Sequence, residues 1–183
     1  MRFVKFTLAG LISIMLAFLS LGFFHSDFKY ENELDINASP SNSFEIFNND
    51  SLKSQWLTGF IEHENLTGSV FQPGHRKLLK FKRGEQTFEM VEELLEIYKG
   101  DKIVFAIETE LFDGINELYF MGSKNKCTLK SYTTIKGTSI FYRAMFYILK
   151  SSMQNQTQQN YEALKKVIEK QEETYKIDAK SLN

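Results

Sequence analysis

An uncharged apolar run near the start of the chain constrains its fold more than any other feature. Residues 6–24 contain no charged side chain, and they follow directly after Lys5. As a helix this run would rise roughly 28 Å, at ~1.5 Å per residue, which is close to the ~30 Å hydrocarbon core of a bilayer. The run therefore predicts one transmembrane helix, with residues 1–25 as an N-terminal membrane anchor.

A cleaved secretory signal peptide is the alternative interpretation of the same run. Ser20 and Gly22 supply the small residues that a cleavage site requires. The apolar region of a signal peptide is usually about 7–15 residues long. The run here is longer and continues through the bulky Phe23 and Phe24, so its length favours an uncleaved anchor.

The flanks and one face of the run give two further expectations. Arg2, Lys5 and the amino group precede it, and Lys29 is the nearest basic residue behind it. Because basic flanks stay in the cytoplasm, we expect a single-pass protein with a cytoplasmic N-terminus and an extracytoplasmic domain. A small residue recurs every four positions, a spacing that lets two helices approach closely and suggests a weak dimer. These small residues are Ala9, Ser13 and Ala17.

The charge balance argues against nucleic acid as a partner. The chain has 22 basic and 23 acidic side chains, and two of the basic ones lie in the anchor, so the remaining domain is slightly acidic. Phosphate binding rests on a basic surface, which this domain lacks. Its one basic cluster is interpreted as solvated charge along an exposed strand, with an acidic partner or anionic lipid as the alternative. The cluster comprises Arg76, Lys77, Lys80, Lys82 and Arg83.

The reactive side chains form no catalytic or metal-binding pattern. Cys127 is the only cysteine and lies in a strand-like segment, where a buried, inert thiol is expected. His25, His63 and His75 lack the spacing of metal ligands, and no G-x-S-x-G motif is present. We therefore expect no metal, no cofactor and no catalytic residue that the sequence can name. General acid–base work by His63, His75 or Tyr142 is the alternative.

Local patterns predict two short helices and a series of strands between the anchor and residue 139. A strand at residues 28–38 precedes a helix that begins at Ser39-Pro40, and a second short helix covers residues 51–57. Alternation and glycine-containing turns then predict further strands. These strands lie at residues 60–66, 75–82, 103–111, 115–121 and 127–134.

Two segments have a helical pattern. Residues 87–98 combine helical spacing of apolar residues with high helix propensity. From Ser139 to about Tyr175 the helical signal is the strongest in the domain, with Phe141, Met145 and Leu149 recurring every four residues. Residues 154–160 within it are all polar, so we expect the helix to leave the core there or to lie over the rim of a sheet.

This order resembles the helix-grip fold of the START-like superfamily, and within it the polyketide cyclase/dehydrase and lipid-transport family, or SRPBCC proteins. The likeness covers about residues 29–171. It implies an α+β domain at residues 26–175, with a curved antiparallel sheet around the long C-terminal helix, a hydrophobic cavity between them and a tail at 176–183. It also implies that residues 87–98 form a strand, against their local pattern. The residues that carry it are Ala38-Ser39-Pro40, Phe44, Phe47, Trp56-Leu57, Gly68 and Pro73-Gly74.

The predicted cavity lining follows from alternation along the strands and from the helical stripe. On residues 103–111 one face is apolar, and Glu108 and Glu110 share the other face with Lys102. The two glutamates could form an acid–base pair, but solvated charge is the preferred interpretation. The candidate lining residues are Trp56, Phe71, Leu79, Phe81, Phe88, Phe105, Ile107, Leu118, Phe120, Phe141, Met145, Phe146 and Leu149.

Three functions are compatible with these features. The leading hypothesis is a membrane-anchored domain that binds a hydrophobic small molecule or lipid in the cavity, which requires no catalytic residue. The second is an enzyme of cyclase, dehydratase or hydrolase type that uses the same cavity. The third is a non-catalytic interaction protein whose core is filled.

Overall fold

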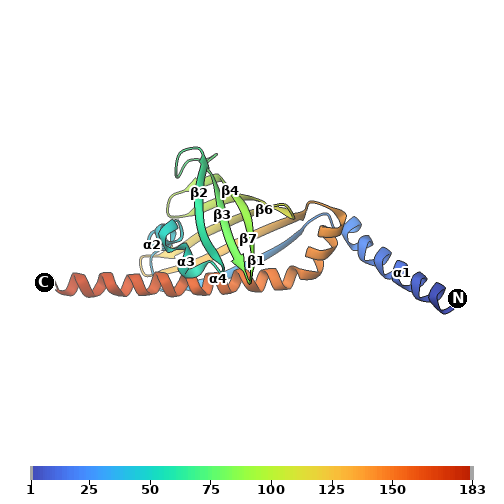
Figure 1. Cartoon of the computed structure of the whole chain (residues 1–183). Coiled ribbons are helices and arrows are strands. Elements are labelled where there is room, and N and C mark those ends of the chain that lie inside the picture. The colour runs from blue at the N-terminus through green and yellow to red at the C-terminus, as the bar shows by residue number, and fades with distance from the viewer. Residues whose placement is uncertain (1, 182–183) are drawn as a thin grey trace.

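A seven-stranded antiparallel sheet curves around a long C-terminal helix in the computed structural model, which describes residues 2–181 (Figure 1). The strand order is β1-β7-β6-β5-β4-β3-β2, so β1 and β2 form the two edges. The strands are β1 (Phe28–Ile36), β2 (Phe60–Thr67), β3 (Arg76–Arg83), β4 (Gln86–Tyr98), β5 (Lys102–Glu108), β6 (Phe112–Ser123) and β7 (Lys126–Gly137). The helices are α1 (Arg2–Phe24), α2 (Pro40–Phe47), the 3-10 turn η1 (Asp50–Leu52), α3 (Lys53–Trp56) and α4 (Ile140–Ser181).

Capping residues fix where the helices begin. The Ser39 side chain accepts a hydrogen bond from the Asn42 amide, and Pro40 occupies the first turn of α2. The hydroxyl of Ser139 likewise accepts from the Tyr142 amide at 3.2 Å, at the start of α4. Both starts agree with the sequence prediction, and α4 continues beyond Tyr175 to Ser181.

Strand β4 resolves the conflict between local pattern and family resemblance in favour of the strand. Leu78 pairs with Val91, and Leu94 pairs with Phe105 on the other side. Apolar residues occur on both faces of β4, and the register shifts between Leu94 and Glu96. A strand with two apolar faces and one bulge produces the helix-like spacing, so the strand implied by the resemblance is confirmed.

Strands β1 and β5 end earlier than predicted, β1 at Ile36 rather than at residue 38. β5 stops at Glu108 rather than continuing to Leu111. The hydroxyl of Thr109 accepts hydrogen bonds from the amides of Leu111 and Phe112, at 3.1 and 3.0 Å. This local turn competes with strand pairing, as Ser and Thr side chains often do.

Two apolar clusters fill parts of the space between the sheet and α4. The larger one joins α2 and α3 to the second half of α4, where Leu164 and Ile168 are fully buried. The smaller one surrounds Phe28, Ile135 and Phe146 at the first half of α4. The free thiol of Cys127 is buried in the larger cluster, as predicted, and burial raises its pKa.

A polar layer separates the two clusters and explains the polar segment of α4. Asn32 donates from Nδ2 to Oε1 of Gln158 at 2.9 Å, and the hydroxyls of Tyr30 and Thr157 lie 3.2 Å apart. Asn32 and Tyr30 belong to the edge strand β1. The polar segment therefore lies over the rim of the sheet, one of the two expected placements, and hydrogen-bonds to it.

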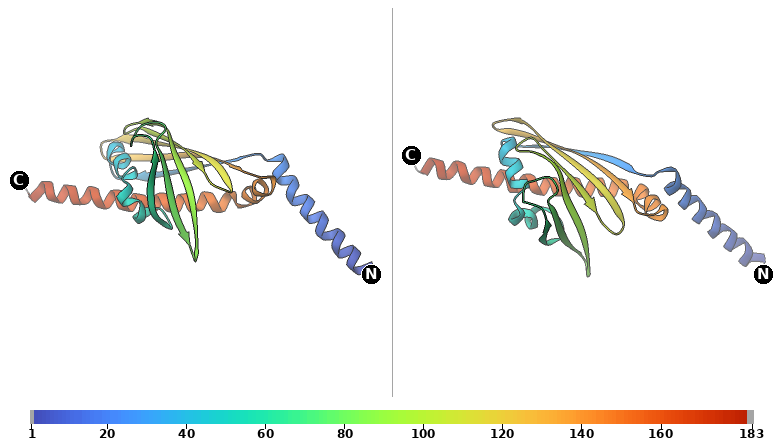
Figure 2. Two further views of the ribbon diagram at one scale, coloured as in Figure 1. Left: turned by 45° about the horizontal axis from the view of Figure 1, so that its top comes forward. Right: turned by 90° about the horizontal axis from the view of Figure 1, so that it is seen from above.

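Helix α1 projects away from the sheet (Figure 2). Residues Phe3–Phe24 have a mean hydropathy of 2.2 and are 6% buried, so by length and composition this helix could cross a membrane. A signal sequence passes the same test. Ala9, Ser13 and Ala17 are exposed on it, and dimerisation through them stays a prediction.

Candidate functional site

Part of the inner face of the sheet is not covered by α4. The helix contacts β1 and β7, on one side of the curved sheet. On the other side Phe88 stacks on Phe81, with ring centroids 5.1 Å apart, yet Phe88 is 46% exposed. Met90 and Ile107 follow on the same face of the neighbouring strands and are only half-buried. The gap between sheet and helix therefore has an open apolar part.

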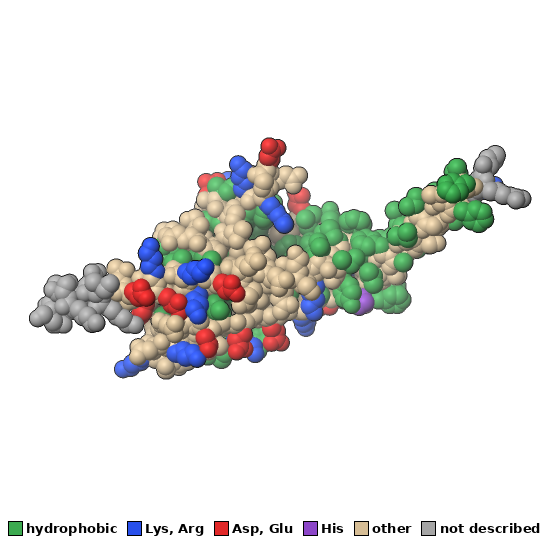
Figure 3. All heavy atoms as spheres, turned by 90° about the horizontal axis from the view of Figure 1, so that it is seen from below, with side chains coloured by type: hydrophobic (Ala, Val, Ile, Leu, Met, Phe, Trp, Pro, Cys, Tyr) green, Lys and Arg blue, Asp and Glu red, His purple; other side chains and the backbone are tan. Residues whose placement is uncertain are grey.

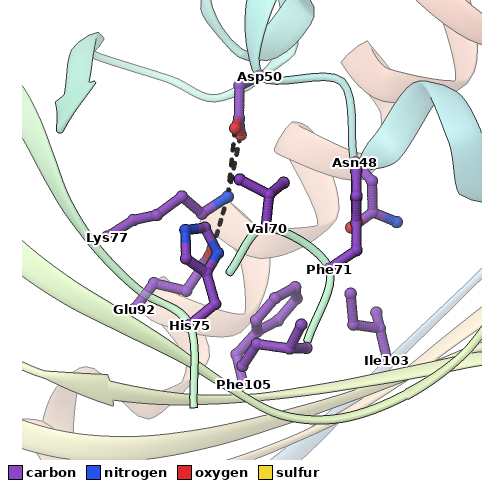
Figure 4. A pocket seen from close by; sticks show the side chains of 10 residues that line it. Asn48, Asp50, Val70, Phe71, His75, Lys77, Glu92, Ile103 and Phe105 are labelled. Carbon is purple, nitrogen blue, oxygen red and sulfur yellow. Dashed lines mark hydrogen bonds and ion pairs between the residues drawn. The ribbon is translucent and has the colours of Figure 1, made fainter. Parts of the chain in front are cut away.

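A small cavity lies on the same face, under the loop that joins β2 to β3 (Figure 4). Its volume is about 20 Å³, room for about one water molecule. One part of its wall is apolar, formed by Val70, Phe71, Leu94, Ile103 and Phe105. The other part is polar, formed by Asn48, Asp50, His75, Lys77 and Glu92.

The loop over this cavity has an unusual backbone. Gly68 and Gly74 have φ angles of 82° and 87°, and Phe71 between them has a φ of 62°. A left-handed aromatic residue costs of order 1–3 kcal/mol. Hydrogen bonds tie the end of the loop to β4, because the Gly74 amide donates to the Leu94 carbonyl at 2.7 Å. The strain falls on a residue that lines the cavity.

Four alternating charges form a network beside the cavity. Oδ1 of Asp50 lies 3.1 Å from Nζ of Lys53 and 3.0 Å from Nζ of Lys77. Oε1 of Glu92 lies 3.6 and 3.4 Å from the same two nitrogens. Nε2 of His63 is 3.5 Å from Oδ2 of Asp50. Lys53 is only 4% exposed, so the network is partly closed off from solvent.

Burial and ion pairing oppose each other at these groups. Burial raises the pKa of Asp50, but Lys53 and Lys77 outweigh it and hold that pKa below its usual value. Burial lowers the pKa of Lys53, but the charges of Glu92 and Asp50 leave it raised. The pKa of His75 is lowered by burial and by Lys77, which favours the neutral imidazole. The two lysines and two carboxylates of the network sum to no net charge, and three of them, Asp50, Lys77 and Glu92, line the cavity.

Most of the predicted lining residues lie on the inner face or in the core. Leu118 and Phe120 of β6 are almost completely buried, and Trp56 packs against Phe47 with ring centroids 5.4 Å apart. Phe71 belongs to the loop over the cavity and is 55% exposed. The remaining sheet residues face the same side: Leu79, Phe81, Phe88, Phe105 and Ile107. Their role in binding stays a prediction.

The helical stripe of predicted lining residues is divided by the structure. Phe146 is buried in the smaller apolar cluster, and Met145 packs against it. Phe141 instead contacts Phe18 of α1, with ring centroids 5.3 Å apart, and is 53% exposed. Leu149 is 43% exposed. The placement of Phe141 toward the sheet was therefore wrong, because α1 contributes a second surface against which the first turns of α4 pack.

The charged residues singled out in the sequence are distributed between both faces. Glu108 faces outward and accepts a hydrogen bond from Arg76 at 2.7 Å, while Glu110 is exposed. This agrees with solvated charge rather than an acid–base pair. His63 and His75 do meet at the charged network, whereas Tyr142 packs in the smaller cluster.

Sequence reasoning missed the four charges of the network. The interpretation of Lys77 as solvated was wrong, since its side chain is 13% exposed and lines the cavity. A signal was present, because Lys77 and Glu92 share the inward face of their strands with the apolar pair Leu79 and Met90. The register places these two directly opposite each other. Lys53 had no such signal, since it lies in a short polar helix.

Comparisons with solved structures identify the class of fold. The Zhui aromatase/cyclase from Streptomyces sp. R1128 superposes with a TM-score of 0.65 at 9% identity, over 78% of this chain and 94% of that chain. Ara h 8.0201 gives a TM-score of 0.63 at 12% identity, over 78% and 97%. Norcoclaurine synthase from Thalictrum flavum, in complex with dopamine and hydroxybenzaldehyde, gives 0.58 at 14% identity, over 78% and 86%.

These similarities define the helix-grip fold of START-like and SRPBCC proteins, as the resemblance implied. At such low identity they define the fold alone. No protein-family model matches the sequence, and no curated protein sequence matches it significantly. The chain is thus a helix-grip domain preceded by an apolar helix.

Proposed function

We propose that this protein is a membrane-anchored helix-grip domain that binds a hydrophobic small molecule or lipid between its sheet and α4. The observation that carries the proposal is the exposed inner face, where Phe88 is 46% exposed although it faces into the curve of the sheet. Exposed aromatic surface on a concave face is typical of ligand sites. The neighbouring charged network has two lysines and two carboxylates. It therefore offers both hydrogen-bond donors and acceptors for a polar group at one end of the ligand.

The cavity beneath the β2–β3 loop is too small for such a ligand as it stands. An apolar ligand would occupy the open part of the inner face and displace the loop around Phe71. The strain at Phe71 and the glycines that flank it make the loop the element that costs least to move. Anchoring by α1 would hold the domain at the bilayer, where apolar ligands concentrate.

Paired tryptophan variants test this proposal in the full chain. Ile107→Trp adds a large ring to the inner face, and Ile115→Trp adds the same ring to the outer face, where Ile115 is 43% exposed. Native mass spectrometry with lipid extraction should find a co-purifying apolar molecule in the wild type and in Ile115→Trp, and lose it in Ile107→Trp. Equal recovery from both variants, or none from the wild type, contradicts the proposal and favours a filled core.

A further inference from the structure

The last part of α1 packs closely against the first turns of α4. Phe18 contacts Phe141, and the rings of His25 and Tyr147 are 3.9 Å apart. Between these contacts a side chain on Gly22 would come within 1.9 Å of the Ile140 carbonyl oxygen. The same Cβ would lie 2.9 Å from the Ala144 amide nitrogen, so the two helices cross in close contact at Gly22. Figure 1 shows the first turns of α4 beside the end of α1 and crossing its direction.

This arrangement fixes the depth of α4 relative to α1. Phe18 lies about 9 Å before the end of α1 at Phe24, at ~1.5 Å rise per residue. Phe141 contacts Phe18 and Ile140 contacts Gly22, so the first turn of α4 lies beside the last turns of α1 and not above its end. If α1 spans a bilayer over its apolar length, then Ile140 and Phe141 lie below the level at which α1 emerges.

The surface at this depth is apolar. Ile140, Phe141 and Ile148 are 45%, 53% and 59% exposed, and Phe24 at the end of α1 is 77% exposed. Arg143 is the sole charged residue in the sequence between positions 140 and 149. Figure 3 shows hydrophobic side chains gathered where α1 meets the domain, and charged ones gathered over the other end of the molecule.

Several backbone polar groups of the adjoining loops have hydrogen-bond partners within the protein. The amide of Thr138 donates to the Leu111 carbonyl at 3.0 Å, and its hydroxyl lies 3.0 Å from the Glu110 carbonyl. Nε of Arg143 donates to the Gly137 carbonyl at 3.2 Å. An unsatisfied backbone polar group costs several kcal/mol in the hydrocarbon core, so backbone that approaches it needs internal hydrogen-bond partners. The turn at residues 109–112 and the segment at 137–139 meet part of that requirement through these bonds.

We propose that this end of the domain inserts into the outer leaflet of the bilayer that α1 spans, through the first turns of α4 and Leu111. The inference rests on the proposed membrane anchor. Lipid is the occupant because the patch is continuous with α1 and held to it by the Gly22 contact. The smaller apolar cluster lies directly behind this patch, so the sheet–helix gap has one end at the membrane surface.

Depth-dependent quenching of single labels tests the proposal in the full chain, in vesicles of phosphatidylcholine and phosphatidylglycerol. An environment-sensitive fluorophore is attached at Ile14→Cys within α1, at Phe141→Cys, at Ile148→Cys, or at Lys166→Cys as the control far along α4. Cys127 is buried and stays in place, with the unsubstituted chain as the labelling control. Lipids that carry a nitroxide on the acyl chain serve as quencher.

We expect strong loss of emission at Ile14 and Phe141, a smaller loss at Ile148, and none at Lys166. Quenching at Ile14 with none at Phe141 and Ile148 would overturn the insertion and leave the anchor standing. Absence of quenching at Ile14 would contradict the proposed membrane anchor, and the proposed insertion would fail with it. A third result would assign the patch to contact with a second copy of the chain. In that case the label at Phe141 shows no quenching by lipid, but it shows self-quenching that disappears on dilution with unlabelled chain.

Discussion

Lys53 is the residue whose role is hardest to derive from its local sequence. It lies in α3, between residues of a polar segment, yet it is 4% exposed and pairs with Asp50 and Glu92. Asp50 is a near neighbour in sequence, but Glu92 comes from a distant strand. No local pattern can predict that pairing, because it depends on how α3 is placed against the inner face of the sheet.

Removal of the Lys53 charge should therefore destabilise the domain strongly. In Lys53→Met the side chain keeps its length, but Asp50 and Glu92 then share Lys77 as their remaining lysine partner in the network. Loss of one partner from a buried ion pair costs about 3 kcal/mol or more. Urea unfolding should show this as a lower midpoint with an unchanged slope.

Lys80→Met is the matched control for that measurement. Lys80 pairs with Glu62 at 2.9 Å, and their side chains are 35% and 59% exposed. Exposed pairs contribute little, so the unfolding midpoint should stay at the wild-type value. Similar effects of the two substitutions would show that the network around Lys53 is solvated rather than buried.

At the scale of elements, the sequence predicts those whose signals are local. The Ser39 and Ser139 caps, the alternation in β1 and β7, and the turn glycines all lie within a few residues of the structure that they specify. Local evidence gives the wrong secondary structure for residues 87–98, because their two apolar faces are explained only by the strands on either side. The contact between α1 and α4 was not predicted either, since it joins segments far apart in the chain.

That contact depends on Gly22. A Cβ at this position would lie 1.9 Å from the Ile140 carbonyl oxygen and 2.9 Å from the Ala144 amide nitrogen, and backbone atoms cannot move aside cheaply. In Gly22→Leu we expect α1 and α4 to separate. A cysteine pair at Phe18→Cys and Phe141→Cys should cross-link on mild oxidation in the parent chain and poorly in the Gly22→Leu background.

Gly10→Leu provides the control for the cross-linking experiment. Nothing lies within 4 Å of a Cβ built at Gly10, so the added side chain meets open space and the cross-link should form as in the parent. Undiminished cross-linking in Gly22→Leu would contradict the close approach of the two helices.

At the scale of the whole molecule, the order of elements identified the fold but not the chemistry. The strand and helix order carried the resemblance, and the solved structures agree with it. The open inner face, the charged network and the close packing of α1 on α4 are properties of the assembled chain. They arise from contacts across the sheet and between its ends, which composition and spacing do not encode.

The anchor itself is tested by extraction of membranes with alkaline carbonate. The apolar helix has a mean hydropathy of 2.2 and is 6% buried in the folded chain, so almost all of it would otherwise face water. We expect the full protein to stay in the membrane pellet. Two arginines, in the double variant Leu11→Arg/Ile14→Arg, cost roughly 2.5–3.5 kcal/mol each near the bilayer centre and should release it. Recovery of a soluble wild-type chain that begins near Phe23 would identify the helix as a cleaved signal.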